Sequence, residues 1–263
     1  MKPQVYVDPR PAEFFARYHE RVRTRRPDWI YRLARVVLTG PMWLLYRARA
    51  IGTERVPERG PVIVAPNHFS TFDHFFLAMF LRREVQFMAK SQLFKFPIDF
   101  ILSHGGTFPV RRGQHDEEAF KTAYNVLGRR GLVGMYAEGG RSRSKQLGKP
   151  KSGLGRLALE SGAPVVPVAI HGSEQVREMK KLRFPKVTIV YGEPIVFDTV
   201  ENPDREQCQW ASEQIFGRVR QLHHVVSTEG RRGVLKRVRQ APSRGAPAVP
   251  VRVSEPARET VNA

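Results

Sequence analysis

Short apolar runs alternate with longer amphipathic segments between residues 51 and 226. The runs predict strands at Val62–Ala65, Val85–Ala89, Gly106–Val110, Leu132–Tyr136, Val165–Ile170 and Val187–Tyr191. The segments between and after them predict helices at Phe72–Arg82, Gln92–Ser103, Glu117–Arg130, Gly153–Ser161 and Arg205–His224. Apolar strands that alternate with helices indicate an α/β fold with a largely parallel or mixed sheet flanked by helices.

The first fifty residues follow a different pattern. Ala12–Arg26 predicts a polar, basic helix, and Trp29–Ala50 predicts one or two amphipathic helices bent at Gly40-Pro41. Tryptophans and tyrosines lie among arginines there, which is typical of a helix in a membrane interface. The alternative is a helix that packs onto the domain and never meets lipid.

The chain end is different again, because from about Ser227 it is rich in Arg, Pro, Gly and Ala, a composition that favours disorder. We therefore divide the chain into three parts. Residues 1–50 form membrane-associating basic helices, residues 51–226 form the main domain, and residues 227–263 form a disordered basic tail.

The formal net charge of +19 adds candidate partners. Such a surface attracts nucleic acid, anionic lipid headgroups or phosphorylated substrates. Residues 1–50 and 228–263 supply net charges of +7 and +5, so the ends carry much of it. No helix-turn-helix or RNA-binding signature accompanies the charge, and we expect no nucleic-acid partner.

Several classes of site and segment are excluded by what the sequence lacks. The single cysteine, Cys208, permits no intrachain disulfide, and the sequence has no HExxH or clustered Cys/His spacing for a metal, so we expect no metal or other cofactor. No G-x-S-x-G elbow of a hydrolase occurs. We expect no signal peptide, and the eleven apolar residues from Val36 to Tyr46 are too few to cross a bilayer, which takes about 20.

A histidine and a carboxylate stand five positions apart where the first strand meets the first helix of the domain. Asp73 falls in the helix's first turn, which Ser70 or Thr71 is placed to cap. Asp73 is close enough to accept a hydrogen bond from one ring nitrogen of His68, leaving the other to take a proton from a hydroxyl. The same residues also fit a plain loop histidine and a helix-start acid.

Other polar groups also stand at predicted strand ends. They are Lys90, the pair Arg111-Arg112, the turn Glu138-Gly139-Gly140-Arg141, and His171, which with His74 is a rival base to His68. Ligands of open α/β sheets bind at such ends, and arginines suit phosphate. Taken singly, each also fits an ordinary turn or surface charge.

The order of these blocks is specific. The chain has N-H-x4-D at Asn67–Asp73, then G-x-F-P-V-R-R, E-G-G-R and V-V-P-V around Pro167. This series resembles the glycerolipid acyltransferase family, whose type member is lysophosphatidic acid acyltransferase, over about residues 50–200. The resemblance implies an acyltransferase domain at residues 51–226. The acyl donor would be acyl-CoA or acyl carrier protein, and the acceptor 1-acylglycerol 3-phosphate (lysophosphatidic acid).

The resemblance also implies roles for individual residues. His68 would be the general base and Asp73 its orienting partner. Lys90, Arg112 and Arg141 would bind the acceptor's phosphate, while Glu138, Gly139 and Gly140 would shape its pocket.

Two departures from the family pattern change the expected site. Gly140 replaces a usual threonine, so a hydroxyl is missing, and Arg111 replaces a common acid, so the site is more basic. Other acceptors therefore stay open: glycerol 3-phosphate, a lysophospholipid or a glycolipid. So does a non-enzymatic basic membrane-binding protein, although that alternative leaves the four blocks unexplained. We expect a peripheral or monotopic enzyme at the cytoplasmic face of a membrane, next to anionic lipid.

Overall fold

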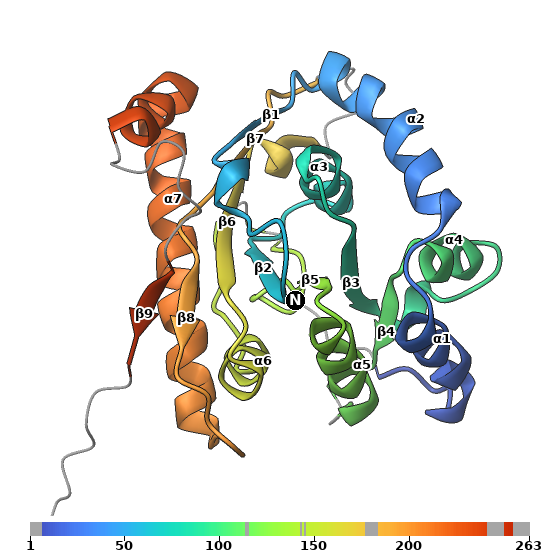
Figure 1. Cartoon of the computed structure of the whole chain (residues 1–263). Coiled ribbons are helices and arrows are strands. Elements are labelled where there is room, and N and C mark those ends of the chain that lie inside the picture. The colour runs from blue at the N-terminus through green and yellow to red at the C-terminus, as the bar shows by residue number, and fades with distance from the viewer. Residues whose placement is uncertain are drawn as a thin grey trace, which may run out of the picture.

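The structure is a computed structural model that describes residues 7–113, 116–142, 144, 146–176, 184–240 and 250–254. Its centre is a mixed nine-stranded sheet (Figure 1). The strands are β1 (Arg49–Ile51), β2 (Val62–Pro66), β3 (Val85–Lys90), β4 (Phe108–Val110), β5 (Leu132–Gly134), β6 (Val165–His171), β7 (Thr188–Tyr191), β8 (Ile195–Phe197) and β9 (Val251–Val253). The predicted α/β fold with a mixed sheet and N-terminal helices is confirmed.

Five strands form a parallel unit in the order β6-β2-β5-β3-β4. At one edge β7 pairs antiparallel with β6, and β1 pairs parallel with β7. Strand β8 also pairs antiparallel with β6, and β9 adds to β8. The carboxyl ends of the five parallel strands therefore meet at one edge of the sheet, where ligands of such sheets bind.

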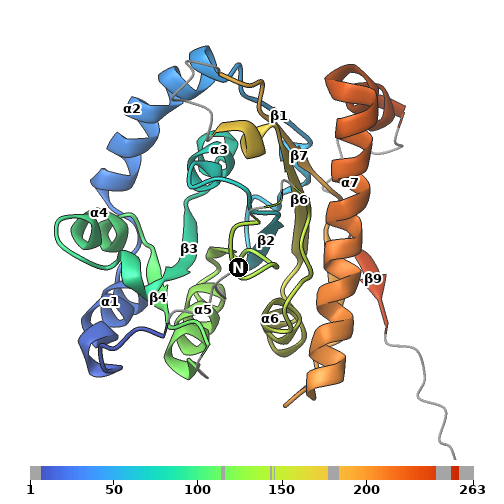
Figure 2. The ribbon, with the colours of Figure 1, turned by 180° about the vertical axis from the view of Figure 1, so that it is seen from behind.

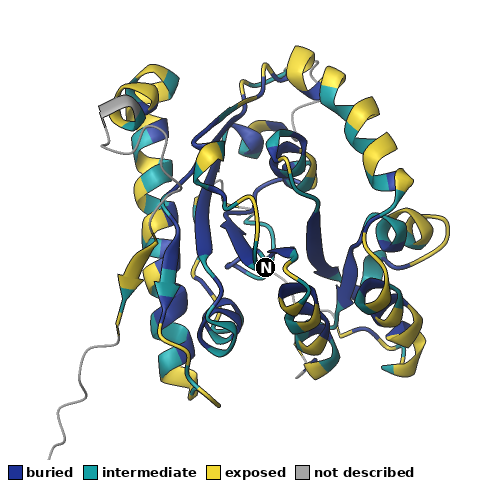
Figure 3. Ribbon diagram, in the orientation of Figure 1, coloured by how far each residue is buried: buried dark blue, intermediate teal, exposed yellow. Residues whose placement is uncertain are grey.

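Helices cover both faces of the sheet (Figures 1 and 2). They are α1 (Glu13–Thr24), α2 (Trp29–Leu45), α3 (Asp73–Phe80), α4 (Ile98–His104), α5 (Glu117–Gly128), α6 (Gly153–Ser161) and α7 (Arg205–Gln240). Helices α5, α6 and most of α7 pack on one face, and α2 and α3 pack on the other. The strands between them are buried along most of their length (Figure 3).

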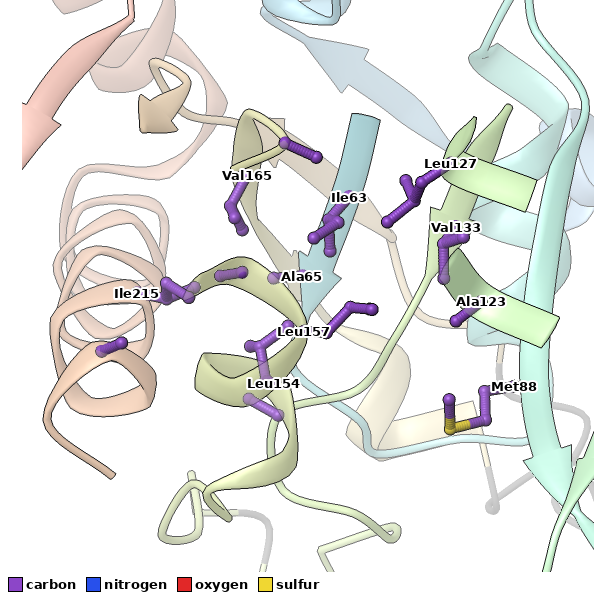
Figure 4. Packing of buried hydrophobic residues seen from close by; sticks show 14 of the residues in the cluster. Ile63, Ala65, Met88, Ala123, Leu127, Val133, Leu154, Leu157, Val165 and Ile215 are labelled. Atoms are coloured by element: carbon purple, nitrogen blue, oxygen red, sulfur yellow. The ribbon is translucent and has the colours of Figure 1, made fainter. Parts of the chain in front are cut away.

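Alternate residues of β2 build the two cores, because successive side chains of a strand point to opposite faces. Ile63 and Ala65 face the core under α5 and α6, where Leu154 and Leu157 pack beside them (Figure 4). Val62 and Val64 face the core under α3. A strand buried on both faces explains why this segment reads as an unbroken apolar run.

The predicted helix boundaries needed correction in the first half of the chain. Helix α2 runs through Gly40-Pro41 and ends at Leu45, because residues 49–51 pair with β7 as a strand. The helix predicted at Gln92–Ser103 is a 3₁₀ turn at Ser91–Leu93 followed by α4, because Pro97 has no N–H to continue a helix through residues 92–97.

The predicted disordered tail is wrong for the part of it that the structure describes. Helix α7 continues to Gln240 across a kink at Gly230, and residues 251–253 form β9. Val226 and Val234 are buried against Ile51 and Val190. The arginine-rich stretch is helical because two valines of this region face the sheet. Residues 241–249 and 255–263 lie outside the described part.

Val234→Ala tests whether this extension is part of the folded domain. It removes two buried methyl groups, so the free energy of unfolding should fall by about 1–3 kcal/mol. The exposed neighbour Leu235 provides the control, and Leu235→Ala should change the free energy of unfolding by less than about 0.5 kcal/mol. Denaturant unfolding measures both, and equal small effects would show that residues 227–240 add nothing to the core.

Candidate active site

Four segments that follow parallel strands meet at the carboxyl edge of the sheet. His68 follows β2, Lys90 ends β3, Arg112 follows β4, and the turn Glu138-Gly139-Gly140-Arg141 follows β5. The backbone N–H of Ser142 donates to the carbonyl of His68 at 2.8 Å, which joins the first and last of these segments. The structure thus brings together the site residues that the sequence predicted, while their roles stay predictions.

The His68 ring is held by a fully buried carboxylate. His68 Nδ1 lies 2.9 Å from Asp73 Oδ2, and an ionised carboxylate only accepts, so Nδ1 carries the proton. The same oxygen accepts the backbone N–H groups of Phe69 and Ser70, each at 2.8 Å. Asp73 therefore fixes both the ring and the loop that carries it. His68 Nε2 makes no hydrogen bond within the described residues and is left for a substrate.

The predicted helix cap is replaced by this arrangement. Helix α3 begins at Asp73 with Phe72 at the N-cap position, and no side chain caps it. Ser70 Oγ instead accepts the N–H of Phe72 at 3.2 Å. The carboxylate that was expected to interact with the helix start also closes the preceding turn.

Aromatic side chains enclose His68. Its ring stacks on Tyr136 with centroids 3.9 Å apart and an interplanar angle of 24°. Burial lowers the pKa of His68, and the hydrogen bond and charge of Asp73 oppose this shift without cancelling it. Arg141 and Arg112 lower the pKa of His68 further. The imidazole is therefore neutral, and able to accept a proton, at neutral pH.

Glu138 holds the backbone of the site through two hydrogen bonds. Its Oε1 accepts the N–H of His68 at 3.0 Å, and its Oε2 accepts the N–H of Gly148 at 2.8 Å. Burial raises the pKa of this carboxyl group. Because both oxygens are bonded to backbone, Glu138 positions the His68 loop. Gly139 adopts a left-handed conformation (φ 63°) in the tight turn that leads through Gly140 to Arg141.

Asn67 is a positioning residue for which the sequence, although it shows Asn67 in the N-H-x4-D block, predicted no role. Its side-chain nitrogen donates to the carbonyl of Ile170 at 3.0 Å, and its side-chain oxygen accepts the N–H of Ile170 at 2.7 Å. The amide thus continues the ladder between β2 and β6 where the backbone of β2 turns away. The one available signal was a polar residue next to His68 at the end of an apolar run.

Three cationic side chains, those of Lys90, Arg112 and Arg141, follow neighbouring strands at this edge of the sheet. Burial lowers the pKa of Lys90, as do the charges of Arg141 and Arg112, and burial and Arg141 lower the pKa of Arg112. Such mutual effects require these groups to be close. Within the described residues neither Lys90 nor Arg112 pairs with a carboxylate, whereas Arg111 lies 3.6 Å from Asp116. Arg112 is thus the one of the two adjacent arginines that is left for an anion.

Arg141 connects this cationic cluster to the neighbouring helix start. Its Nη1 donates to Thr71 Oγ1 at 2.7 Å. Thr71 and His74 also line an apolar cleft of about 190 Å³ between α2, α3, α4 and β3. Most of the cleft wall is aliphatic or aromatic, for example Leu38 and Phe87. A ligand could therefore bind with its polar head at the cationic cluster and its apolar chain in the adjacent cleft.

The rival bases lack what His68 has. His74 Nδ1 donates to the carbonyl of Thr71 at 3.3 Å, and burial lowers the pKa of His74 to about 4. His171 Nδ1 is buried and has no hydrogen-bond partner among the residues that the structure describes, and its ring contacts His223. Within the described residues, neither ring is hydrogen-bonded to a carboxylate that would stabilise an imidazolium. Cys208 is buried in α7, where its backbone carbonyl contacts Gly155 of α6.

A sequence model of a known family matches the part of the chain that holds the candidate active site. Residues 47–171 match the sequence model of the acyltransferase family. We call residues 47–171 the acyltransferase segment. The acyltransferase segment includes His68, Asp73, Lys90, Arg112 and Glu138–Arg141, so the resemblance read from the four blocks is confirmed.

Two curated relatives and one solved structure show how far the similarity extends. The chain is 27% identical to a chloroplastic 1-acyl-sn-glycerol-3-phosphate acyltransferase of Brassica napus over 135 residues, which are 50% of this chain and 39% of that protein. It is 30% identical to a glycerol-3-phosphate acyltransferase of Aeromonas hydrophila over 175 residues, or 58% and 22% of the two chains. The chain therefore spans well under half the length of either relative.

The structural comparison supports the fold. The 1-acyl-sn-glycerophosphate (LPA) acyltransferase PlsC of Thermotoga maritima covers 80% of this chain, and 89% of its own chain is covered, with a TM-score of 0.53 at 20% identity. The α/β sheet of the acyltransferase segment and the helices around it are thus an arrangement already seen in a crystal structure.

The pKa of His68 makes the pH dependence of any acyl transfer predictable. Only neutral His68 accepts a proton, so the rate should fall on the acid side with an apparent pKa below the ordinary value of 6.5. Asp73→Asn removes the negative charge that favours the imidazolium. It should therefore lower this apparent pKa further and reduce the plateau rate by about 10²–10⁴-fold.

The measurement is kcat against pH for both proteins with one acceptor, so that ionisation of the acceptor itself cancels in the comparison. An acid limb with an apparent pKa above 6.5 in the unmodified protein, or unchanged in Asp73→Asn, would contradict the assignment of His68 as the base.

Proposed function

We propose that this protein transfers a fatty acyl group from a thioester to the free hydroxyl of a phosphate-bearing glycerolipid. Its best acceptor is 1-acylglycerol 3-phosphate, which gives phosphatidic acid for phospholipid synthesis. One observation carries the proposal: the buried His68–Asp73 pair and the cationic side chains of Lys90, Arg112 and Arg141 lie at the same carboxyl edge of the sheet. The donor is acyl-CoA or acyl carrier protein.

The geometry supports a direct transfer. The acceptor hydroxyl gives its proton to His68 Nε2 as its oxygen attacks the thioester carbonyl. Asp73 stabilises the imidazolium that forms, as the aspartate does in a serine-protease triad. The proton then passes to the departing thiolate. The acceptor's own hydroxyl is the nucleophile, so this mechanism needs no reactive side chain, and buried Cys208, with a pKa raised by burial, is unsuited to that role.

The cationic cluster supports an acceptor with a phosphate group. Guanidinium groups bind phosphate oxygens through paired hydrogen bonds, and a fixed phosphate places the hydroxyl near His68. Such positioning supplies up to about 7–11 kcal/mol in favourable cases. The apolar cleft beside Thr71 favours an acceptor that already carries an acyl chain. Glycerol 3-phosphate is the second candidate, because one relative is named for that acceptor.

A panel of acceptors tests the function. The purified protein is incubated with labelled acyl-CoA and with 1-acylglycerol 3-phosphate, glycerol 3-phosphate, or a 1-acylglycerol that has no phosphate. We expect labelled product from the first at the highest rate and none from the last. Equal rates with and without phosphate would contradict the role of the cluster, and no product from any acceptor would contradict the function.

Arg112→Ala and Arg141→Ala should raise the KM for the phosphorylated acceptor by at least tenfold. Each removes a charge-assisted contact to the phosphate and leaves the donor's KM nearly unchanged. Arg111→Ala is the matched control, because Arg111 lies against Asp116. Initial-rate kinetics with each substrate varied in turn separate the two constants. If only the donor's KM moves, the arginines bind the donor and the assignment is wrong.

We further propose that the enzyme works as a peripheral or monotopic protein on the cytoplasmic face of a membrane rich in anionic lipid. Trp29 and Trp43 are exposed on α2, and arginines flank them along α1 and α2. This combination supports binding at the level of the headgroups. Within the described residues, no helix has both the length and the hydropathy that crossing a bilayer requires.

Binding to anionic vesicles should weaken as salt rises, because the Debye length shrinks from about 10 Å at 0.1 M to about 3 Å at 1 M. It should not disappear, because the inserted aromatic side chains add an apolar contribution that does not depend on salt. Vesicle co-sedimentation over this salt range, with neutral vesicles as the control, measures both parts. Equal binding to neutral and anionic vesicles would contradict the electrostatic part.

A further inference from the structure

Helix α4 and the turn before it expose large apolar side chains. Phe96 is 89% exposed, and Ile98, Phe100 and Ile101 are 50–53% exposed. Single exposed apolar residues are common on soluble proteins, but a group of this size is not. The helix was predicted from its apolar residues as an ordinary element of the α/β domain, and nothing in the sequence indicated that those residues face outward.

Helix α2 exposes a second apolar surface beside α4. Trp29, Leu33, Val37 and Leu44 recur at helical spacing on its outer side, and Val36 is 74% exposed. Its opposite side, from Ile30 to Met42, lines the apolar cleft. Helices α2 and α4 lie side by side at one outer side of the molecule, and both carry exposed residues there (Figures 1–3). We call these exposed residues of α2 and α4, with Phe96, the apolar platform.

The platform is held rigidly. Asp28 Oδ1 caps α2 at the N–H of Ile30, and its Oδ2 lies 2.6 Å from both Arg21 Nη2 of α1 and His104 Nδ1 of α4. A second link joins Tyr18 of α1 to Asp99 of α4 at 2.7 Å. One carboxylate thus connects three helices, so α4 presents its apolar side chains from a fixed position.

Cationic residues adjoin the platform. Lys95 stands next to Phe96, and Arg25 and Arg26 stand just before α2. All three are exposed, and within the described residues none is seen paired with a carboxylate. Arg35 lies on the wall of the cleft itself. An apolar surface bordered by unpaired cations complements an anionic lipid bilayer, which offers acyl chains beneath a negatively charged layer of headgroups.

We propose that α4 forms, together with α2, one bilayer-contacting surface, and that the cleft between them opens onto this surface. Phe96, Ile98 and Phe100 insert among the headgroups. The acyl chain of a lipid then moves from the bilayer into the cleft without passing through water, and its headgroup meets the cationic cluster at His68. The identity of that lipid rests on the proposed function, whereas the bilayer contact of α4 does not.

The test is the triple variant Phe96→Ser/Ile98→Ser/Phe100→Ser. These side chains are exposed and lie outside the cleft wall, so the fold and the site should remain intact; circular dichroism and thermal unfolding check this. The matched control is Leu235→Ser/Val251→Ser, which removes exposed apolar side chains from α7 and β9. Both elements lie on the opposite side of the molecule (Figures 1 and 2).

Three measurements are made on each protein. The first is partitioning onto vesicles of phosphatidylglycerol and phosphatidylcholine. The second is transfer of a labelled acyl group to long-chain 1-acylglycerol 3-phosphate within such vesicles. The third is transfer from hexanoyl-CoA to hexanoylglycerol 3-phosphate as dissolved monomers without vesicles. We expect vesicle partitioning and the transfer rate within vesicles to fall at least tenfold in the triple variant, and its transfer rate with dissolved monomers to fall less than twofold. The control variant should behave as the unmodified protein does in all three measurements.

Four outcomes would overturn the proposal. In the first, the triple variant partitions onto vesicles as the unmodified protein does. In the second, the control variant loses as much vesicle binding and vesicle activity as the triple variant. In the third, the triple variant loses partitioning, vesicle activity and monomer activity to the same extent. The fourth is found by light scattering: the unmodified protein is a dimer at assay concentration and the triple variant is a monomer, so that the platform is covered by a second copy. If the unmodified protein acylates neither acceptor, the proposed function fails, and the partitioning result still decides the role of α4.

Discussion

The hydrogen bond between His68 and the buried carboxylate of Asp73 is the interaction on which the site depends. A carboxylate with no exposure to solvent is costly unless it is hydrogen-bonded. Within the described residues Asp73 Oδ1 has no partner, so Oδ2 carries all of the hydrogen bonds of this carboxylate. Asp73 Oδ2 accepts from the His68 ring and from the backbone of Phe69 and Ser70, so the turn between β2 and α3 closes around it. The same contacts that make the buried charge tolerable orient the imidazole and keep Nε2 toward the substrate side.

The surrounding sheet extends this constraint to the phosphate-binding side chains. Asn67 holds the end of β2 against β6, and Glu138 holds the backbone of His68 against the turn after β5. Arg141 leaves that turn and reaches Thr71, which lies within the loop that Asp73 closes. The distance between the base and the cationic cluster is therefore set by backbone contacts of neighbouring parallel strands. A site of this kind tolerates little movement, as positioning catalysis requires.

The sequence predicted the parts of this structure whose signals are local. Fully apolar runs such as β2 and β6 are buried on both faces, and the strand ends carried the polar residues of the site. Short strands such as β1 were missed because three residues have no periodicity and pair only in the context of the sheet. The predicted tail was wrong over residues 226–240 because the two valines that pack this stretch against the sheet are outnumbered by arginines. The outward direction of Phe96 was equally hidden, because exposure depends on Asp28 and His104 holding α4 beside α2.

The central claim is that His68 activates the acceptor directly, with no acyl group ever bound to the protein. The most direct test mixes labelled acyl-CoA with unmodified protein and with His68→Ala, first without acceptor and then with 1-acylglycerol 3-phosphate. The account predicts no label on either protein after denaturation, labelled phosphatidic acid from the unmodified protein, and a rate at least about 100-fold lower from His68→Ala. Label that stays on the protein and leaves only when acceptor is added, or an undiminished rate in His68→Ala, would contradict it.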